Sequence, residues 1–116
     1  MKVYILDEGS SSLDQMLLWL SGNPKISAVE LYSDCSRFIS RVMELPPTLC
    51  IIRLGYEGTS GLKTAKIIKN MYPNILIIFT SEERGYALDA YELGANGYLL
   101  CPTDKNKFEK CLRLGG

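Results

Sequence analysis

The chain contains no histidine, so it lacks the commonest general base and the usual phosphohistidine carrier. Its four cysteines are far apart and form no CxxC pair, and no structural zinc site is predicted. It has no net charge, since thirteen basic residues balance thirteen acidic ones, which argues against nucleic-acid binding. The first apolar segment ends at Asp7 and is too short for a signal peptide or membrane span. We expect a soluble protein of the reducing cytoplasm, without direct contact to nucleic acid or membrane.

The length and composition fit one compact domain. The chain has 116 residues, of which 47% are hydrophobic. A chain of this size buries roughly two thirds of the surface that its unfolded form exposes, which is enough for a core without metal or disulfides. We therefore expect a single domain over residues 1–116.

Short β-rich apolar runs alternate with segments of helical periodicity, five times over. The predicted strands cover residues 3–6, 28–32, 49–52, 75–79 and 98–100. The predicted helices begin near 13, near 35, at 59 or 60, near 86 and near 104, and the third ends before Pro73. Residues 10–12 offer caps for the first helix, Gly94 ends the fourth and Thr103 caps the fifth. The pattern predicts an α/β fold, a doubly wound sheet of five parallel strands with five helices.

Ligands of such sheets bind at the carboxyl ends of the strands, near the point where the strand order reverses. The residues that follow the strands are therefore the candidates for a functional site. They are Asp7 and Glu8 after the first strand, Arg53 after the third, Thr80 and Ser81 after the fourth, and Cys101 and Pro102 after the fifth.

Residues 77–102 read IIFTSEERGYALDAYELGANGYLLCP. This segment resembles the receiver domain of bacterial two-component response regulators, whose pattern is strand, Thr/Ser-Ala, helix, Gly-Ala, aromatic, two apolar residues and Lys-Pro. The resemblance covers essentially the whole chain, and YALDAYELGANGYLL is most similar to receivers that precede LytTR-type DNA-binding domains. It implies the CheY-like, flavodoxin-like strand order 2-1-3-4-5.

In that family, an acidic pair after the first strand and an aspartate after the third hold Mg²⁺, and this aspartate accepts a phosphoryl group from a histidine kinase. The resemblance places Asp7 and Glu8 at the acidic pair and Thr80 at the switch hydroxyl. It places Tyr98 at the switch aromatic and Pro102 at the proline after the fifth strand.

Two positions depart from the family pattern. The phosphoacceptor position falls on Arg53, because Gly61 has the spacing of the family's loop glycine. The loop before it, GYEGTSG over residues 55–61, also lacks the family's Met-Pro. Cys101 stands where the family has its phosphate-binding lysine.

Arginine cannot replace the aspartate chemically, because phosphoryl transfer to a protein needs a carboxylate nucleophile and a divalent cation. A positively charged guanidinium at this position would repel Mg²⁺ and would satisfy the nearby carboxylates itself. We therefore expect an internal ion pair of Arg53 with Asp7 and Glu8. We also expect no catalytic residue, no cofactor, and weak or absent Mg²⁺ binding.

The charged candidates after the first and third strands also have simpler, structural interpretations. Asp7 and Glu8 are also compatible with an ordinary acidic turn. Arg53 is most simply a structural salt-bridge partner. The alternative is an anion site, since Thr80, Ser81 and backbone amides at helix starts share the same rim.

The remaining candidates lie near the fifth strand. Cys101 is more often an inert small residue than a redox sensor, and only a neighbouring Arg53 would favour reactivity by lowering the thiol pKa. Tyr98 and Tyr86 are expected to pack on the surface of the fourth helix and fifth strand, where the family makes dimers and partner contacts.

Three functions remain as hypotheses. The first is a non-enzymatic, phosphorylation-independent receiver that acts by homodimerisation or by partner binding through the fourth helix, fifth strand and fifth helix. It would be the N-terminal fragment of a longer regulator, with a DNA-binding domain beyond Gly116. The second is a phosphorelay or an anion- or metal-responsive receiver, switched through another residue. The third is a small flavodoxin-like nucleotide-binding enzyme, disfavoured because no Gly-rich phosphate loop follows the first strand.

Overall fold

The computed structural model describes residues 1–55 and 59–113. Part of the loop over 55–61 and the Gly115-Gly116 end therefore lie outside the described residues. The strands are β1 (Lys2–Leu6), β2 (Ala28–Tyr32), β3 (Leu49–Arg53), β4 (Leu76–Ser81) and β5 (Gly97–Leu100). The helices are α1 (Leu13–Ser21), α2 (Cys35–Glu44), α3 (Thr59–Met71), the short 3₁₀ helix η1 (Arg84–Tyr86), α4 (Ala87–Glu92) and α5 (Lys105–Leu112).

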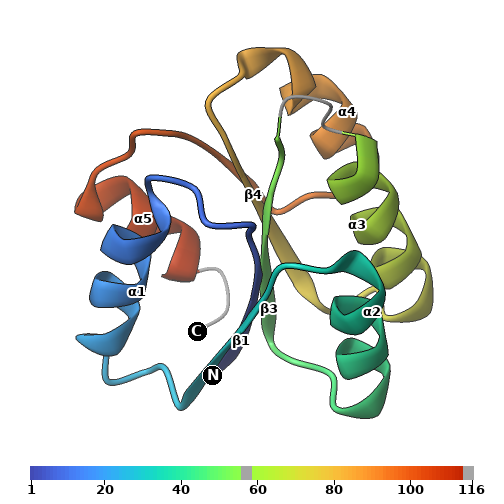
Figure 1. The fold of residues 1–116 in the computed structure, drawn as a ribbon, viewed down its shortest axis with the longest axis horizontal. Helices are drawn as coiled ribbons and strands as arrows, with labels where there is room; N and C mark the ends of the chain where they lie inside the picture. The colour runs from blue at the N-terminus through green and yellow to red at the C-terminus, as the bar shows by residue number, and fades with distance from the viewer. Residues whose placement is uncertain (56–58, 114–116) are drawn as a thin grey trace.

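The strands form one parallel sheet in the order β2-β1-β3-β4-β5. Helices α1 and α5 cover one face of the sheet, and α2, α3 and α4 cover the other (Figure 1). This arrangement confirms the predicted doubly wound fold and its strand order. Within the described residues, no helix has the length and apolar character to cross a membrane.

The two faces of the sheet carry two separate cores, because side chains alternate along each strand. Ile51 packs with Met16 of α1 and Phe108 of α5, whereas the next residue, Ile52, packs with Phe38 of α2. A strand covered on both faces must be apolar at every position, which explains the continuous apolar run of β3. The same alternation decides on which face the polar residues at the strand ends project.

The helix caps differ in part from the sequence prediction. The cap of α5 is Asp104, whose carboxylate accepts a hydrogen bond from the Lys107 amide at 2.8 Å, so the prediction of Thr103 was wrong. A carboxylate one residue later reaches the free amides of the first turn and also interacts favourably with the helix dipole. Ser12 occupies the cap position of α1, but its side chain makes no cap hydrogen bond.

Helix α2 is fixed to the edge strand β2 by a charged network. Arg41 donates to both carboxylate oxygens of Glu30, at 2.8 and 3.0 Å, and the hydroxyl of Tyr32 donates to Glu30 at 2.6 Å. These hydrogen bonds, from Arg41 and then from Tyr32, lower the pKa of Glu30 to about 2. The network lies on the far side of β1 from β4 and β5.

Candidate functional site

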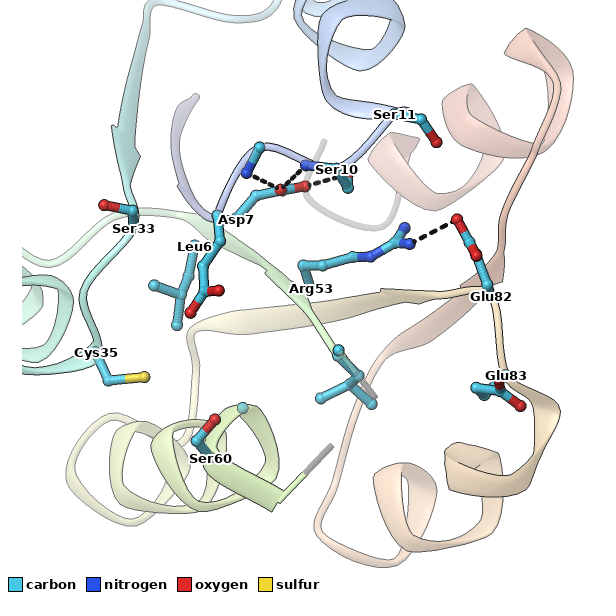
Figure 2. A pocket seen from close by; sticks show the side chains of 15 residues that line it. Leu6, Asp7, Ser10, Ser11, Ser33, Cys35, Arg53, Ser60, Glu82 and Glu83 are labelled. Atoms are coloured by element: carbon cyan, nitrogen blue, oxygen red, sulfur yellow. Dashed lines mark hydrogen bonds and ion pairs between the residues drawn. The ribbon is translucent and has the colours of Figure 1, made fainter. Parts of the chain in front are cut away.

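A cleft of about 600 Å³ opens at the carboxyl ends of β1, β3 and β4 (Figure 2). It lies where the strand order reverses, as expected for this type of sheet. The charged side chains that line it are those of Asp7, Glu8, Arg53, Glu82 and Glu83. Asp7, Glu8 and Arg53 were predicted from the sequence as candidate site residues, whereas Glu82 and Glu83 were not. Thr80, Tyr98, Cys101 and Pro102 are not among the lining residues.

Asp7 is almost completely buried, with 3% of its surface exposed, and its carboxylate is occupied by its own loop. One oxygen accepts hydrogen bonds from the amides of Gly9 and Ser10, at 2.8 and 2.7 Å. The other accepts from the Ser10 hydroxyl at 2.8 Å. Gly9 has φ of +105°, which favours glycine and lets the chain turn back over the carboxylate. Asp7 therefore organises the β1–α1 loop.

Arg53 ends β3, and its guanidinium lies against Glu82, not against Asp7 (Figure 2). Nη2 of Arg53 is 3.2 Å from a carboxylate oxygen of Glu82. The side chain of Arg53 is only 13% exposed, whereas that of Glu82 is 55% exposed. The predicted ion pair with Asp7 and Glu8 was therefore wrong. The carboxylate of Asp7 already has three donors, and Arg53 pairs instead with the acid that directly follows the neighbouring strand.

Thr80 is the strand partner of Arg53 in the β3–β4 register. The backbone continues the pairing beyond β3, because the Leu54 amide donates to the Thr80 carbonyl at 2.8 Å. Partners in register project to the same face of a sheet. Thr80 is fully buried, and its hydroxyl has no hydrogen-bond partner among the described residues. Nη1 of Arg53 is also buried and has no hydrogen-bond partner among the described residues. Thr80 and Arg53 therefore each leave one buried polar atom without a hydrogen bond.

A hydrogen bond from β5 also holds the loop that follows β4. The hydroxyl of Tyr98 donates to the backbone carbonyl of Glu83, and the Glu83 amide donates to the Ser81 hydroxyl at 2.9 Å. Burial raises the pKa of Tyr98, so the phenol stays protonated as a donor. Tyr98 thus ties β5 to the loop that carries Glu82.

Cys101 and Pro102 follow β5 and stay out of the cleft. Cys101 is 5% exposed, and its thiol contacts the Leu99 carbonyl at 3.8 Å. The Cys101-Pro102 peptide bond is cis. Buried free thiols commonly serve as small packing residues, and Cys101 occupies such a position at the end of β5.

The whole arrangement matches one protein family. The sequence model of the response regulator receiver domain matches residues 3–113. The chain belongs to this family. Proteins with similar sequences include the sensory transduction protein LytT of Oceanobacillus iheyensis, 24% identical over 94% of this chain and 46% of its own length. Another is LytR of Staphylococcus epidermidis, 23% identical over 97% of this chain and 44% of its own length. The chain thus spans less than half the length of these relatives.

Solved receiver structures share the fold. The response regulatory domain of MrkE from Klebsiella pneumoniae superposes with a TM-score of 0.87 at 18% identity, covering 98% of this chain and 93% of that one. The isolated receiver domain of RcsB from Salmonella enterica serovar Typhimurium, in the presence of the phosphomimetic BeF₃⁻, superposes with a TM-score of 0.83 at 21% identity. That match covers 97% of this chain and 86% of the RcsB chain. The family resemblance drawn from residues 77–102 is confirmed.

Sequence reasoning missed Glu82 as the partner of Arg53. A signal was present, since Glu82 and Glu83 directly follow Thr80 and Ser81 at the end of the predicted fourth strand. In a parallel sheet of this order, the third and fourth strands are neighbours, so a cation after one strand meets an anion after the next. The resemblance to the receiver pattern instead led to the prediction that Arg53 pairs with Asp7 and Glu8, the acids after the first strand.

Proposed function

We propose that this receiver works without phosphorylation at the usual position and acts through protein contacts. The observation that carries the proposal is the ion pair between Arg53 and Glu82 at the end of β3. Arg53 stands at the phosphoacceptor position by sequence spacing, and a guanidinium has no nucleophilic oxygen to receive a phosphoryl group. The protein is accordingly proposed to be a non-enzymatic signalling module of the cytoplasm.

The residues around the cleft fit Mg²⁺ poorly. No group of three acidic or cysteine side chains is arranged to hold a metal ion within residues 1–55 and 59–113. Both oxygens of Asp7 already accept hydrogen bonds, and the positive charge of Arg53 lines the same cleft. Mg²⁺ needs near-octahedral oxygen ligands and dehydrates reluctantly. We propose that Mg²⁺ binding is weak or absent and that the domain needs no cofactor.

The ion pair also supports a mechanical role. It links the end of β3 to Glu82, the first residue after β4, while the Tyr98 hydroxyl holds the carbonyl of Glu83 from β5. The loop between β4 and α4 is thereby held at both sides by internal contacts. We propose that these contacts fix the loop, and with it the surface of α4, in one arrangement without a phosphoryl group.

We further propose that the surface formed by α4, β5 and α5 mediates homodimerisation. Leu88 and Tyr91 lie one helical turn apart on α4 and are 70% and 53% exposed. The charged residues of α4 are both acidic, whereas α5 carries three lysines and one glutamate. An acidic helix and a basic helix that flank the same edge strand from opposite faces of the sheet are self-complementary in a two-fold dimer. Within a longer protein, such dimers would position C-terminal DNA-binding domains.

Self-association of the domain, measured by analytical ultracentrifugation, tests this proposal. Leu88→Glu places a charge on the exposed apolar part of α4 and is expected to weaken the dimer at least about tenfold. Leu18→Glu is the matched control, because Leu18 is similarly exposed, at 65%, but lies on α1. Acetyl phosphate with Mg²⁺ is expected to leave the dissociation constant unchanged. Equal weakening by both substitutions, a monomer throughout, or a shift with the phosphodonor would contradict the proposal.

A further inference from the structure

We propose that the seam between α2 and α3 is a docking groove for an acidic amphipathic helix of a protein partner. The residues that form this groove do not line the strand-end cleft, and none of them belongs to α4, β5 or α5. The inference therefore goes beyond the proposed function and depends neither on Arg53 nor on the proposed dimer.

Exposed apolar side chains gather along this seam. Among the described residues, eight large apolar side chains are exposed, and four of them belong to α2, to its C-cap or to α3. They are Met43, Leu45, Ile67 and Met71, which are 55%, 39%, 45% and 39% exposed and which we call the apolar strip. Single exposed apolar residues are ordinary, whereas a group of them on neighbouring elements indicates a binding surface.

The contacts of α3 place Ile67 and Met71 on the flank that faces α2. Each residue of a helix is turned by about 100° from the one before it, so Lys69 projects roughly opposite to both. Nζ of Lys69 donates to the Pro73 carbonyl at 3.3 Å and to Oδ1 of Asn96 at 3.1 Å. Asn96 directly precedes β5, so Lys69 faces the β5 side of α3. Ile67 and Met71 therefore face the other side, where α2 lies (Figure 1).

The same argument places Met43 on the flank of α2 that faces α3. Arg41 projects toward the edge strand β2, where its Nε lies 2.8 Å from the Glu30 carboxylate. Met43 follows two residues later and therefore projects to the opposite flank. The two helices pack against each other on the same face of the sheet (Figure 1). The apolar strip thus lies along the seam between them.

The apolar strip continues into a hollow of about 550 Å³ before β3 and β4. Met71 lines this hollow together with Pro46 and Pro47, which follow α2, and with Tyr72 and Pro73, which follow α3. Because Met71 belongs both to the strip and to the hollow, the two form one continuous groove. A concave apolar groove suits the side chains along one face of a helix better than a flat membrane surface.

The charge around the groove determines the chemistry of the partner. Helices α2 and α3 carry five basic residues and one acidic residue, Glu44, although the whole chain has no net charge. Glu44 is paired with Arg41 at 3.0 Å. Lys63 lies one helical turn before Ile67, and neither Lys63 nor Lys66 forms an ion pair with a described residue. A basic rim around an apolar groove complements an acidic amphipathic helix.

Fluorescence anisotropy tests the inference with a designed helical peptide of about 18 residues, or about five turns, with leucines on one face and glutamates on its flanks. The wild-type chain is expected to bind it saturably, and more weakly in high salt. A second peptide, with lysine in place of every glutamate, is expected to bind at least about tenfold more weakly. Ile67→Glu and Met43→Glu are each expected to weaken binding of the acidic peptide at least about tenfold.

Two variants with the same charge changes are the matched controls. Leu18→Glu adds a negative charge at an exposed leucine of α1, and Lys25→Glu reverses a charge in the loop before β2. Both are expected to leave binding of the acidic peptide unchanged, whereas Lys63→Glu weakens it severalfold. Circular dichroism verifies that each variant is folded, and Met43→Glu keeps the inference testable where Ile67→Glu does not fold.

The inference is overturned if the acidic peptide does not bind saturably, if the two peptides bind equally, or if the controls weaken binding as much as the groove variants. Self-association that is lost in Ile67→Glu would contradict it, because a second copy would then occupy the groove. Binding to phosphatidylglycerol vesicles that is lost in Ile67→Glu would also contradict it, in favour of a membrane surface. Phosphorylation and the effect of Leu88→Glu on the dimer are measured separately, so the proposed function is tested independently.

Discussion

Replacing Arg53 with aspartate is expected to increase the affinity of the cleft for Mg²⁺ at least about a hundredfold. The substitution changes the local charge by two units, and unit charges 4 Å apart near a protein surface interact by about 4 kcal/mol. A carboxylate at this position faces the same cleft as Asp7 and Glu8 and supplies the oxygen ligands that Mg²⁺ prefers. The Ser10 hydroxyl, which holds one oxygen of Asp7, can rotate away to free a ligand. Isothermal titration calorimetry with MgCl₂ measures the effect.

Arg53→Asn separates loss of the positive charge from gain of a carboxylate. It removes the guanidinium and its ion pair with Glu82, but adds no negative charge. We expect its Mg²⁺ affinity to lie between those of the wild type and Arg53→Asp. If Arg53→Asp binds Mg²⁺ no more tightly than the wild type, the cleft has lost more than its phosphoacceptor, and the interpretation of Arg53 as the decisive change is incorrect.

The second large effect is expected for Gly61, near the start of α3. A Cβ atom built there would lie 2.6 Å from Cδ2 of Leu54 and 3.3 Å from the carbonyl oxygen of Arg53. The helix start therefore packs directly on the end of β3, with no room for a side chain. Gly61→Ala forces Leu54 or the helix to move, and overpacking of this kind costs about 1–3 kcal/mol in free energy of unfolding. Urea unfolding followed by circular dichroism measures this loss.

Gly55→Ala is the matched control for this prediction. It lies in the connection that leads from β3 into α3, and a Cβ atom there meets nothing within 4 Å. We expect its effect on the free energy of unfolding to stay within about 0.5 kcal/mol. Equal destabilisation by the two substitutions would mean that backbone freedom, and not close packing on β3, explains the glycine at position 61.

Much of the fold could be predicted because a parallel sheet covered on both faces leaves a strong sequence pattern. The run at 49–52 is apolar at every position, and the structure places β3 at Leu49–Arg53. The run at 75–79 was placed slightly early, since β4 is Leu76–Ser81. Thr80 and Ser81 are polar and look like the end of a strand, yet both are fully buried and paired in the sheet. Polarity alone does not show where the ladder of backbone hydrogen bonds stops.

The site was predicted in location but not in its contacts. Asp7, Glu8 and Arg53 do line one cleft, because the topology brings the ends of β1 and β3 together. The partner of Arg53 depends on details that residue type does not reveal. Gly9 and Ser10 give Asp7 three local donors, so Asp7 has no need of the guanidinium, and Glu82 receives it instead. Such competition between short-range and long-range partners is decided only by the folded geometry.

We propose that this receiver does not accept a phosphoryl group at the usual position. Intact-mass measurement of the domain after incubation with acetyl phosphate and Mg²⁺ tests it most directly, with Arg53→Asp as the positive control. We expect the mass of the wild type to stay unchanged, while the variant gains the mass of one phosphoryl group. A phosphoryl adduct on the wild type would contradict the proposed phosphorylation-independent function, and peptide mapping would then locate the residue that replaces the missing aspartate.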